Sequence, residues 1–313
     1  MAQRRSSSEE ILSRRELLRL ALGAITVQLS GVTMAATPSL IRRQVPRTGE
    51  LLPAIGLGTW QTFDVGEGES RRAPLREVLG EFARLGGRVV DSSPMYGQSE
   101  GVLGDLAAEL GAQKQLFLAT KVWTNGREAG IRQMEESFKR LRAQRIDLMQ
   151  VHNLVDWRAH LATLRRWKKQ GKVRYIGVTH YTQGAYDELG RVLESEDLDF
   201  VQLNYSIAER GAEDRMLPLA AERRLAVLVN RPFAEGALFR KVRGKALPPW
   251  AAEIGCKSWA QFFLKFVISH PAVTCAIPAT SQVAHLKDNM GAGVGTLPDA
   301  AMRERMARYV EEV

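Results

Sequence analysis

Residues 146–152 (IDLMQVH) and 173–179 (VRYIGVT) are the stretches that decide the fold. Both are short and apolar on both faces, and a longer helical stretch separates them. This pattern is typical of parallel strands in a sheet that helices cover. The two stretches therefore predict a strand–helix–strand unit, the repeating unit of parallel α/β folds.

The same alternation extends in both directions along the chain. Between the strands, apolar residues such as Val78, Leu79, Phe82 and Leu85 fall on one face of a helix. Eight strands, each followed by a helix, over roughly 240 residues match the size of a (β/α)8 TIM barrel. The expected strands cover residues 54–57, 88–91, 116–121, 146–152, 173–179, 200–203, 225–230 and 273–277.

Two further features bear on the choice of fold. Residues 41–52, with Thr48-Gly49 at a turn, predict a short N-terminal β-hairpin ahead of the barrel. The rival fold is a doubly wound sheet, but residues 56–60 (GLGTW) lack the third glycine of its fingerprint and open no clear helix. We therefore expect an α/β barrel.

Composition narrows the class of protein. The chain has 313 residues, of which 45% are hydrophobic and 25% charged, which is typical of a globular protein. Its only cysteines, Cys256 and Cys275, exclude a disulfide framework and a four-thiolate zinc site. Residues 1–47 contain eight arginines and three glutamates, or +5 of the +9 formal charge, which leaves +4 for the remainder. That remainder is a weak candidate for nucleic-acid binding.

The N-terminal segment has the pattern of an export signal. A charged stretch at residues 13–19 (SRRELLR) precedes an uncharged stretch at residues 20–36 that ends in small residues. The adjacent Arg14 and Arg15 resemble a twin-arginine signal, which implies a periplasmic or exported protein. We expect a signal over residues 1–36 and a single domain over residues 37–313, without stable membrane insertion. The alternatives are an N-terminal amphipathic helix or membrane anchor, and a cytoplasmic protein.

Four polar residues lie at or just after the ends of consecutive strands: Asp91, Tyr96, Lys121 and His152. Each by itself has an ordinary structural explanation, such as a turn cap or a hydrogen-bonded core histidine. In a barrel, however, the strand ends meet at the face that carries the active site. An ammonium next to a phenol lowers its pKa, and a carboxylate holds that ammonium in place. Such a set suits proton donation to a carbonyl oxygen while a nicotinamide supplies hydride.

The chain resembles the aldo/keto reductase family from about residue 52 to residue 289. The resemblance implies that Asp91, Tyr96, Lys121 and His152 form the catalytic tetrad. Tyr96 would be the general acid, Lys121 its pKa partner, Asp91 the support for Lys121, and His152 the residue that orients the carbonyl. The stretches that carry the resemblance are residues 56–60 (GLGTW), 91–97 (Asp-Ser-Ser-Pro-Met-Tyr-Gly), 119–121 (ATK), 148–152 (LMQVH), 171–179 (GKVRYIGVT), 201–205 (VQLNY) and 270–278 (HPAVTCAIP).

The resemblance also implies a cofactor site with several unusual positions. Asn230 stands where the family commonly has an aromatic residue that stacks on the nicotinamide, and Phe233 or Phe239 are possible substitutes. Ala279 and His285 stand where NADPH-dependent relatives often have a lysine and an arginine for the 2′-phosphate. The implied cofactor residues are Gly58, Thr59, Trp60, Thr179, His180, Gln202, Asn230, Arg231, Pro232, Phe233, Thr280, Ser281, Gln282, His285 and Asn289.

We expect NADPH as the cofactor, with NADH possible. A basic run after the seventh strand could compensate for the missing charge at the 2′-phosphate, although such a run is also typical of a solvated loop. It comprises Arg231, Arg240, Lys241, Arg243 and Lys245.

The leading hypothesis is a monomeric oxidoreductase that reduces an aldehyde or ketone, with an open site for small-molecule carbonyl substrates. The alternative is a nicotinamide-binding sensor or regulatory protein with little turnover. A metal-dependent hydrolase that uses His152 and Asp91 is disfavoured, because no second histidine lies at a strand end. We expect no metal site.

Overall fold

The computed structural model describes residues 39–313. The predicted export signal at residues 1–36 lies outside the described residues, as do the first two residues of the predicted domain.

A β-hairpin opens the described chain, as the sequence predicts. Strand β1 (Arg42–Gln44) pairs antiparallel with β2 (Leu51–Pro53). The turn between them reverses at Gly49, whose φ of +75° suits a residue without a side chain. Val45 and Leu52 are fully buried in a cluster with apolar residues of the barrel strands, such as Phe117.

Polar contacts also join the hairpin to the barrel through Glu50. Its carboxylate accepts hydrogen bonds from Tyr175 Oη at 2.7 Å and Arg174 Nη2 at 2.5 Å, and from Arg88 at 3.3 Å. Burial raises the pKa of Glu50, but the hydrogen bonds from Tyr175 and Arg174 outweigh it, so the pKa is lowered. The hairpin is thus fixed by an ionised carboxylate as well as by apolar contact.

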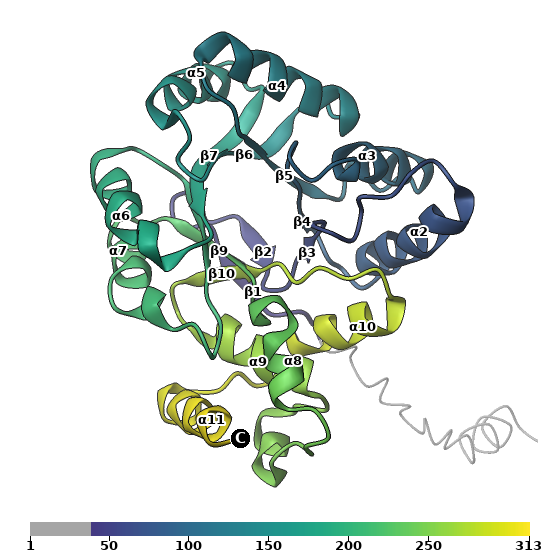
Figure 1. Ribbon diagram of the computed structural model, residues 1–313, viewed down its shortest axis with the longest axis vertical. Coiled ribbons are helices and arrows are strands. Elements are labelled where there is room, and N and C mark those ends of the chain that lie inside the picture. Colours follow the sequence, from purple (N-terminus) through teal and green to yellow (C-terminus); the bar gives the residue numbers. More distant parts are fainter. Residues whose placement is uncertain (1–38) are drawn as a thin grey trace, which may run out of the picture. The chain divides into compact units, whose positions relative to one another are not determined.

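Eight parallel strands form the central sheet, and each pairs with its neighbours in chain order (Figure 1). The first strand region also meets the last through bridges from Ile55 to Ala276 and from Gly58 to Ala279. These bridges close the sheet and confirm the predicted (β/α)8 TIM barrel. The strands are β3 (Leu57–Gly58), β4 (Val89–Asp91), β5 (Phe117–Val122), β6 (Ile146–His152), β7 (Val173–His180), β8 (Phe200–Asn204), β9 (Ala226–Asn230) and β10 (Val273–Ala276).

Helices surround the sheet, as Figure 1 shows. On α2, the predicted apolar face is buried at Val78, Leu79 and Phe82. The α-helices are α2 (Glu69–Arg84), α3 (Ser99–Glu109), α4 (Arg127–Arg140), α5 (Trp157–Lys169), α6 (Tyr186–Ser195), α7 (Met216–Glu222), α8 (Ala237–Lys241), α9 (Trp259–Ser269), α10 (Val283–Ala292) and α11 (Ala300–Glu312). Short 3-10 helices are η1 (Gln183–Ala185), η2 (Gly211–Glu213), η3 (Ala234–Gly236) and η4 (Pro249–Ile254).

The first strand is displaced from its expected position. The sequence predicts a strand at residues 54–57, whereas β3 covers Leu57–Gly58. The preceding backbone is instead hydrogen-bonded to the other side of the seam: Gly56 N donates to Ala276 O at 2.8 Å, and Ala276 N donates to Ala54 O at 2.9 Å. Closure of the barrel brings residues 54–56 next to β10, and this contact between distant segments determines how the first strand pairs.

The closing seam depends on the absence of a side chain at Gly56. A Cβ built there would lie 2.8 Å from Val89 O and 3.0 Å from Cys275 Sγ, both of which belong to neighbouring strands. Gly56→Ala should therefore lower the free energy of unfolding by about 1–3 kcal/mol, the usual cost of overpacking. Urea denaturation measures this change.

Gly101, in the first turns of α3, is the matched control. No heavy atom lies within 4 Å of a Cβ built at this position. Gly101→Ala should raise stability by roughly 0.5–1 kcal/mol, because alanine loses less conformational entropy in a helix. Equal effects of the two substitutions would contradict the close approach at the seam.

Candidate active site

The four predicted tetrad residues meet at the carboxyl-terminal mouth of the barrel. Asp91 and His152 are the last residues of β4 and β6, and Lys121 lies one residue before the end of β5. Tyr96 lies in the loop between β4 and α3. Because β4, β5 and β6 are parallel neighbours, their ends bring these side chains together.

Lys121 is the buried centre of the group. Its side chain is fully buried, and Nζ donates to Asp91 Oδ2 and to Ser92 O, both at 2.7 Å. Burial lowers the pKa of Lys121, but the negative charge of Asp91 and the phenol of Tyr96 outweigh it, so the pKa is raised. The lysine is therefore held as an ammonium.

Tyr96 lies against this ammonium, with Lys121 Nζ 5.0 Å from the centroid of its ring. Burial raises the pKa of Tyr96, and the opposing effect of Lys121 is smaller. The residue types alone predict a net lowering, so this direction is a correction. The reason is desolvation, which disfavours the phenolate more than one ammonium favours it.

His152 completes the group. Its ring centroid is 6.1 Å from that of Tyr96, edge to face. Only 7% of the residue is exposed, and Nδ1 lies 3.2 Å from Ser93 Oγ. Burial, aided by the charges of Lys121 and His180, lowers the pKa of His152 to about 3. The imidazole is therefore neutral near neutral pH, and it can offer either a donor or an acceptor.

Backbone strain is concentrated around this mouth. Residues other than glycine rarely adopt positive φ, and strained residues cluster at functional sites. The loop that follows His152 has three such residues, Asn153, Leu154 and Asp156, with φ of 51°, 57° and 45°. The loop after β9 has another three, at Arg231, Ala234 and Glu235. Most of the residues other than glycine that have positive φ within residues 39–313 thus lie in loops that follow strand ends.

Exposed apolar side chains lie in other loops that follow the barrel strands. Trp60, which is among the expected cofactor residues, and Met95 are 42% and 40% exposed. Trp123 and Tyr181, at 42% and 46%, were missed. Their positions just past the ends of β5 and β7 would have been the signal. Gln133 fixes the Trp123 backbone by accepting from its N–H at 2.6 Å and donating to its carbonyl at 3.2 Å.

Several of the expected cofactor residues lie on the adjacent strands β7, β8 and β9. Thr179, near the end of β7, donates from Oγ1 to Gln202 Oε1 on β8 at 3.2 Å. This leaves Gln202 Nε2 buried without a partner, and the Oδ1 of Asn230 at the end of β9 is also buried without one. An unpaired amide donor and an unpaired amide acceptor on neighbouring strands fit an amide group of the nicotinamide type. His180, the next residue after Thr179, is half-buried, and burial lowers its pKa.

The two phenylalanines that follow β9 contact each other. Phe233 and Phe239 pack on each other with ring centroids 4.8 Å apart, and Phe239 also contacts Phe263 of α9 at 5.8 Å. Both phenylalanines are thus part of an aromatic cluster with the helix layer. Pro232 is buried beside them.

Three residues of the basic run make hydrogen bonds or ion pairs within the chain. Lys241 donates to Glu311 O at 3.3 Å, and Lys245 donates to Val313 O, both at the end of α11. Arg231 donates to Tyr181 O at 3.2 Å and pairs with Glu235 at 3.3 Å.

The remaining cofactor candidates surround the start of α10. The helix has Gln282 as its N-cap, and no side chain caps it. Thr280 is buried, while Ser281, Gln282 and His285 are exposed. Asn289, on the second turn of the helix, is buried. On the other side of the seam, Gly58 pairs with the exposed Ala279, and the buried Thr59 Oγ1 donates to Asp91 O at 3.0 Å.

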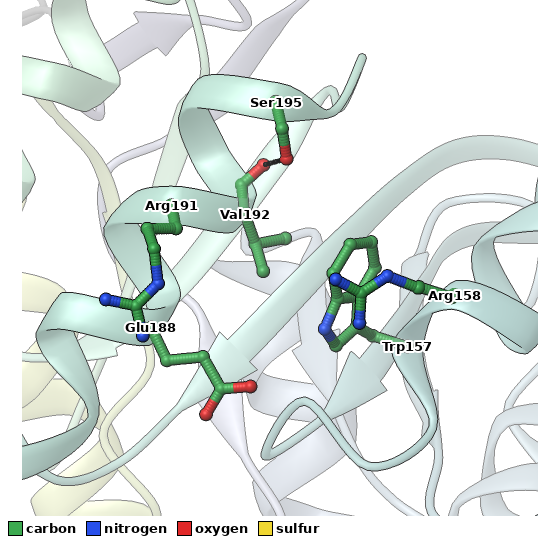
Figure 2. Close-up of a pocket in the computed structure, with 6 residues that line it drawn as sticks. All are labelled: Trp157, Arg158, Glu188, Arg191, Val192 and Ser195. Carbon is green, nitrogen blue, oxygen red and sulfur yellow. Dashed lines mark hydrogen bonds between the residues drawn. The ribbon is translucent and has the colours of Figure 1, made fainter.

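Figure 2 shows a hollow that is separate from the tetrad. It lies between α5 and α6, has a volume of about 340 Å³, and is lined by Trp157, Arg158, Glu188, Arg191, Val192 and Ser195. The guanidinium of Arg158 lies over the indole of Trp157, 4.1 Å from the ring centroid. None of the predicted site residues lines it, and its chemistry is that of a polar surface groove.

Residues 39–313 were also searched for metal sites and for membrane-crossing helices. No three or more His, Cys, Asp or Glu side chains in this part of the chain are placed to hold a metal ion together. Within the same residues, no helix is long and apolar enough to cross a membrane. Both cysteines are buried and unbonded.

A barrel with Asp, Tyr, Lys and His at its mouth defines a class of protein, and comparison with known proteins identifies that class. The aldo/keto reductase family profile matches residues 54–307. The chain therefore belongs to the aldo/keto reductase family.

Individual relatives agree with this placement. The chain is 31% identical over 245 residues to methylglyoxal reductase YeaE of Escherichia coli (strain K12), covering 76% of this chain and 84% of that protein. An NADH-specific methylglyoxal reductase of the same organism is 28% identical over 221 residues, covering 60% and 65%. The aldo/keto reductase from Klebsiella pneumoniae, solved with NADP and acetate, is 26% identical with a TM-score of 0.72, covering 84% of this chain and 93% of that one.

The buried neutral His152 predicts an acid-dependent loss of stability. Its pKa is about 3 in the folded chain and about 6.5 in an unfolded one. Below pH 6.5 the unfolded state therefore binds more protons, and the free energy of unfolding should fall as pH falls toward 3. His152→Gln should reduce this slope by up to about 1.4 kcal/mol per pH unit.

Urea denaturation between pH 4.5 and 8 measures the slope. His285→Gln, on the exposed part of α10, is the matched control and should retain the slope of the wild type. Identical slopes for the wild type and His152→Gln would show that His152 is not buried in its neutral form.

Proposed function

We propose that this chain is an NADPH-dependent aldo/keto reductase that reduces an aldehyde or ketone, with NADH as a possible second cofactor. The observation that carries the proposal is the buried Asp91–Lys121 ion pair next to Tyr96 at the barrel mouth. The methylglyoxal reductases among its relatives suggest small carbonyl substrates.

The roles of the residues follow from their contacts. A reduced nicotinamide supplies the hydride when it is bound. Gln202 Nε2 and Asn230 Oδ1 have no hydrogen-bond partner and suit its carboxamide, and the uncapped N–H groups of α10 suit a phosphate. Gly58, Thr59 and Trp60 line the other side of the same mouth.

Tyr96 is the proposed general acid. It donates its proton to the carbonyl oxygen as the carbonyl carbon receives hydride, and Lys121 stabilises the phenolate that remains. Asp91 holds Lys121 charged and oriented, and the neutral His152 orients the carbonyl oxygen. A phenol whose pKa is raised stays protonated until the reaction begins, which suits a proton donor.

Tyr96→Phe tests this mechanism. The substitution removes the acidic proton and preserves the ring, so kcat should fall by about 10²–10⁴-fold while the Kd for NADPH changes less than about twofold. Fluorescence titration with NADPH and NADH, followed by turnover on a panel of carbonyls that includes methylglyoxal, provides both measurements. Unchanged turnover would refute the role of Tyr96. Tight nucleotide binding without turnover of any carbonyl by the wild type would favour the nicotinamide-sensing alternative.

Ala279→Lys tests the cofactor preference. An ammonium at this exposed position, next to the start of α10, adds a charged donor where the chain has none. It should lower the Kd for NADPH by a few-fold and leave that for NADH nearly unchanged, because exposed ion pairs contribute about 0.2–1 kcal/mol. Ala301→Lys, on the exposed face of α11, adds the same charge elsewhere and is the control. Equal tightening of both cofactors would contradict a 2′-phosphate site at this position.

We further propose that residues 1–36 are a twin-arginine export signal and that residues 37–313 form one monomeric domain. The paired arginines and the uncharged stretch that follows support the signal. Such a route carries folded proteins, so the barrel would bind its cofactor before export. N-terminal sequencing of the mature protein from fractionated cells tests this. A full-length chain confined to the cytoplasm would support the cytoplasmic alternative.

A further inference from the structure

Two adjacent serines in the loop after β4 have different hydroxyl partners. Ser92 and Ser93 are both fully buried. Ser92 Oγ is hydrogen-bonded to Thr59 Oγ1 at 3.0 Å, whereas Ser93 Oγ lies 3.2 Å from His152 Nδ1. The second contact joins the Asp91–Tyr96 loop to the only imidazole of the tetrad.

The number of available hydrogen atoms decides which atom is the donor in the contact between Ser93 Oγ and His152 Nδ1. The neutral His152 ring has one N–H, on either Nδ1 or Nε2. If Nδ1 carried it, Nδ1 would donate to Ser93 Oγ, and the Ser93 hydroxyl would need another acceptor. Within residues 39–313, His152 is the only hydrogen-bond partner of Ser93 Oγ. A buried donor without an acceptor is costlier than an unused lone pair, so the hydroxyl donates to Nδ1.

The hydrogen on the ring must then be on Nε2. This nitrogen has no hydrogen bond within the described residues, and it is absent from the set of buried unpaired atoms, so it is open to the mouth. The ring stands edge to face with Tyr96. A substrate oxygen bound between the Tyr96 hydroxyl and this nitrogen would therefore meet a second donor. In the opposite tautomer, a nitrogen lone pair would face that oxygen and repel it.

We propose that Ser93 is a positioning residue that holds His152 in the Nε2–H tautomer, so that His152 donates to the carbonyl oxygen instead of repelling it. The catalytic part of this inference rests on the proposed carbonyl reduction. The tautomer itself does not, because it is a property of the folded chain before any ligand binds.

Nitrogen-15 NMR of histidine-labelled protein, without cofactor, reads the tautomer directly. The wild type should show a protonated Nε2 and an unprotonated Nδ1 for His152, assigned by its loss in His152→Gln. Ser93→Ala should give a mixture of tautomers, and Ser93→Cys, which keeps a weak donor, an intermediate spectrum. Ser92→Ala, the neighbouring buried serine, should keep the wild-type tautomer. A protonated Nδ1 in the wild type, or an unchanged spectrum in Ser93→Ala, would overturn the inference.

Kinetic measurements distinguish a Ser93 that positions His152 from a Ser93 that only supports the fold. Ser93→Ala should lower kcat/KM for a carbonyl by about tenfold, the equivalent of one hydrogen bond, with an unchanged Kd for NADPH. In a His152→Gln background the same substitution should cause no further loss, because Ser93 acts through His152. Additive losses in the two backgrounds would contradict this. An Nε2–H signal that depends on Ser93, in a protein that reduces no carbonyl, would support the tautomer assignment and refute only the proposed function.

Discussion

The buried ion pair between Lys121 and Asp91 is the constraint on which the site depends. Removing an ammonium and a carboxylate from water costs several kcal/mol per ion, and only close pairing and further hydrogen bonds offset that cost. Both conditions hold here, since Nζ has contacts of 2.7 Å to Asp91 and to the carbonyl of Ser92. The loop that begins with Asp91 is thereby tied to β5. That loop also contains Tyr96 and Ser93, so the ion pair positions the proton donor and the residue that orients His152.

Closure of the barrel makes this arrangement possible. The ion pair lies between adjacent strands, and their register depends on a sheet whose first and last segments meet at the seam of Gly56 and Gly58. At the opposite end, the hairpin fills the space beneath the strands, with Glu50 bound to Arg174 and Tyr175. The contacts of the hairpin therefore lie at the end of the barrel away from the site, whereas strained loop residues such as Leu154 and Arg231 follow the carboxyl ends of the strands. This division is typical of enzymes on barrel scaffolds.

Much of the fold and of the tetrad could be predicted from local patterns. The strand at residues 146–152 was expected with its observed bounds, because a continuous apolar run between two helices has few other interpretations. The first strand was displaced, because its pairing is decided by closure with β10. Gln133 was missed, since a helix residue that fixes the backbone of a loop has no sequence signal. The placement of Phe233 and Phe239 against α9 likewise depends on packing between distant segments.

The sequence by itself determined the number of βα units, the hairpin, the family and the identity of the four polar residues at the strand ends. Periodicity and residue type are properties of short segments, so they can be read without coordinates. Only the tertiary structure decided the direction in which the pKa of Tyr96 shifts and the different partners of Ser92 and Ser93. Burial and hydrogen bonding depend on what lies across the barrel mouth. Two adjacent serines are equivalent in a sequence, and they become different only when the chain folds and one of them faces His152.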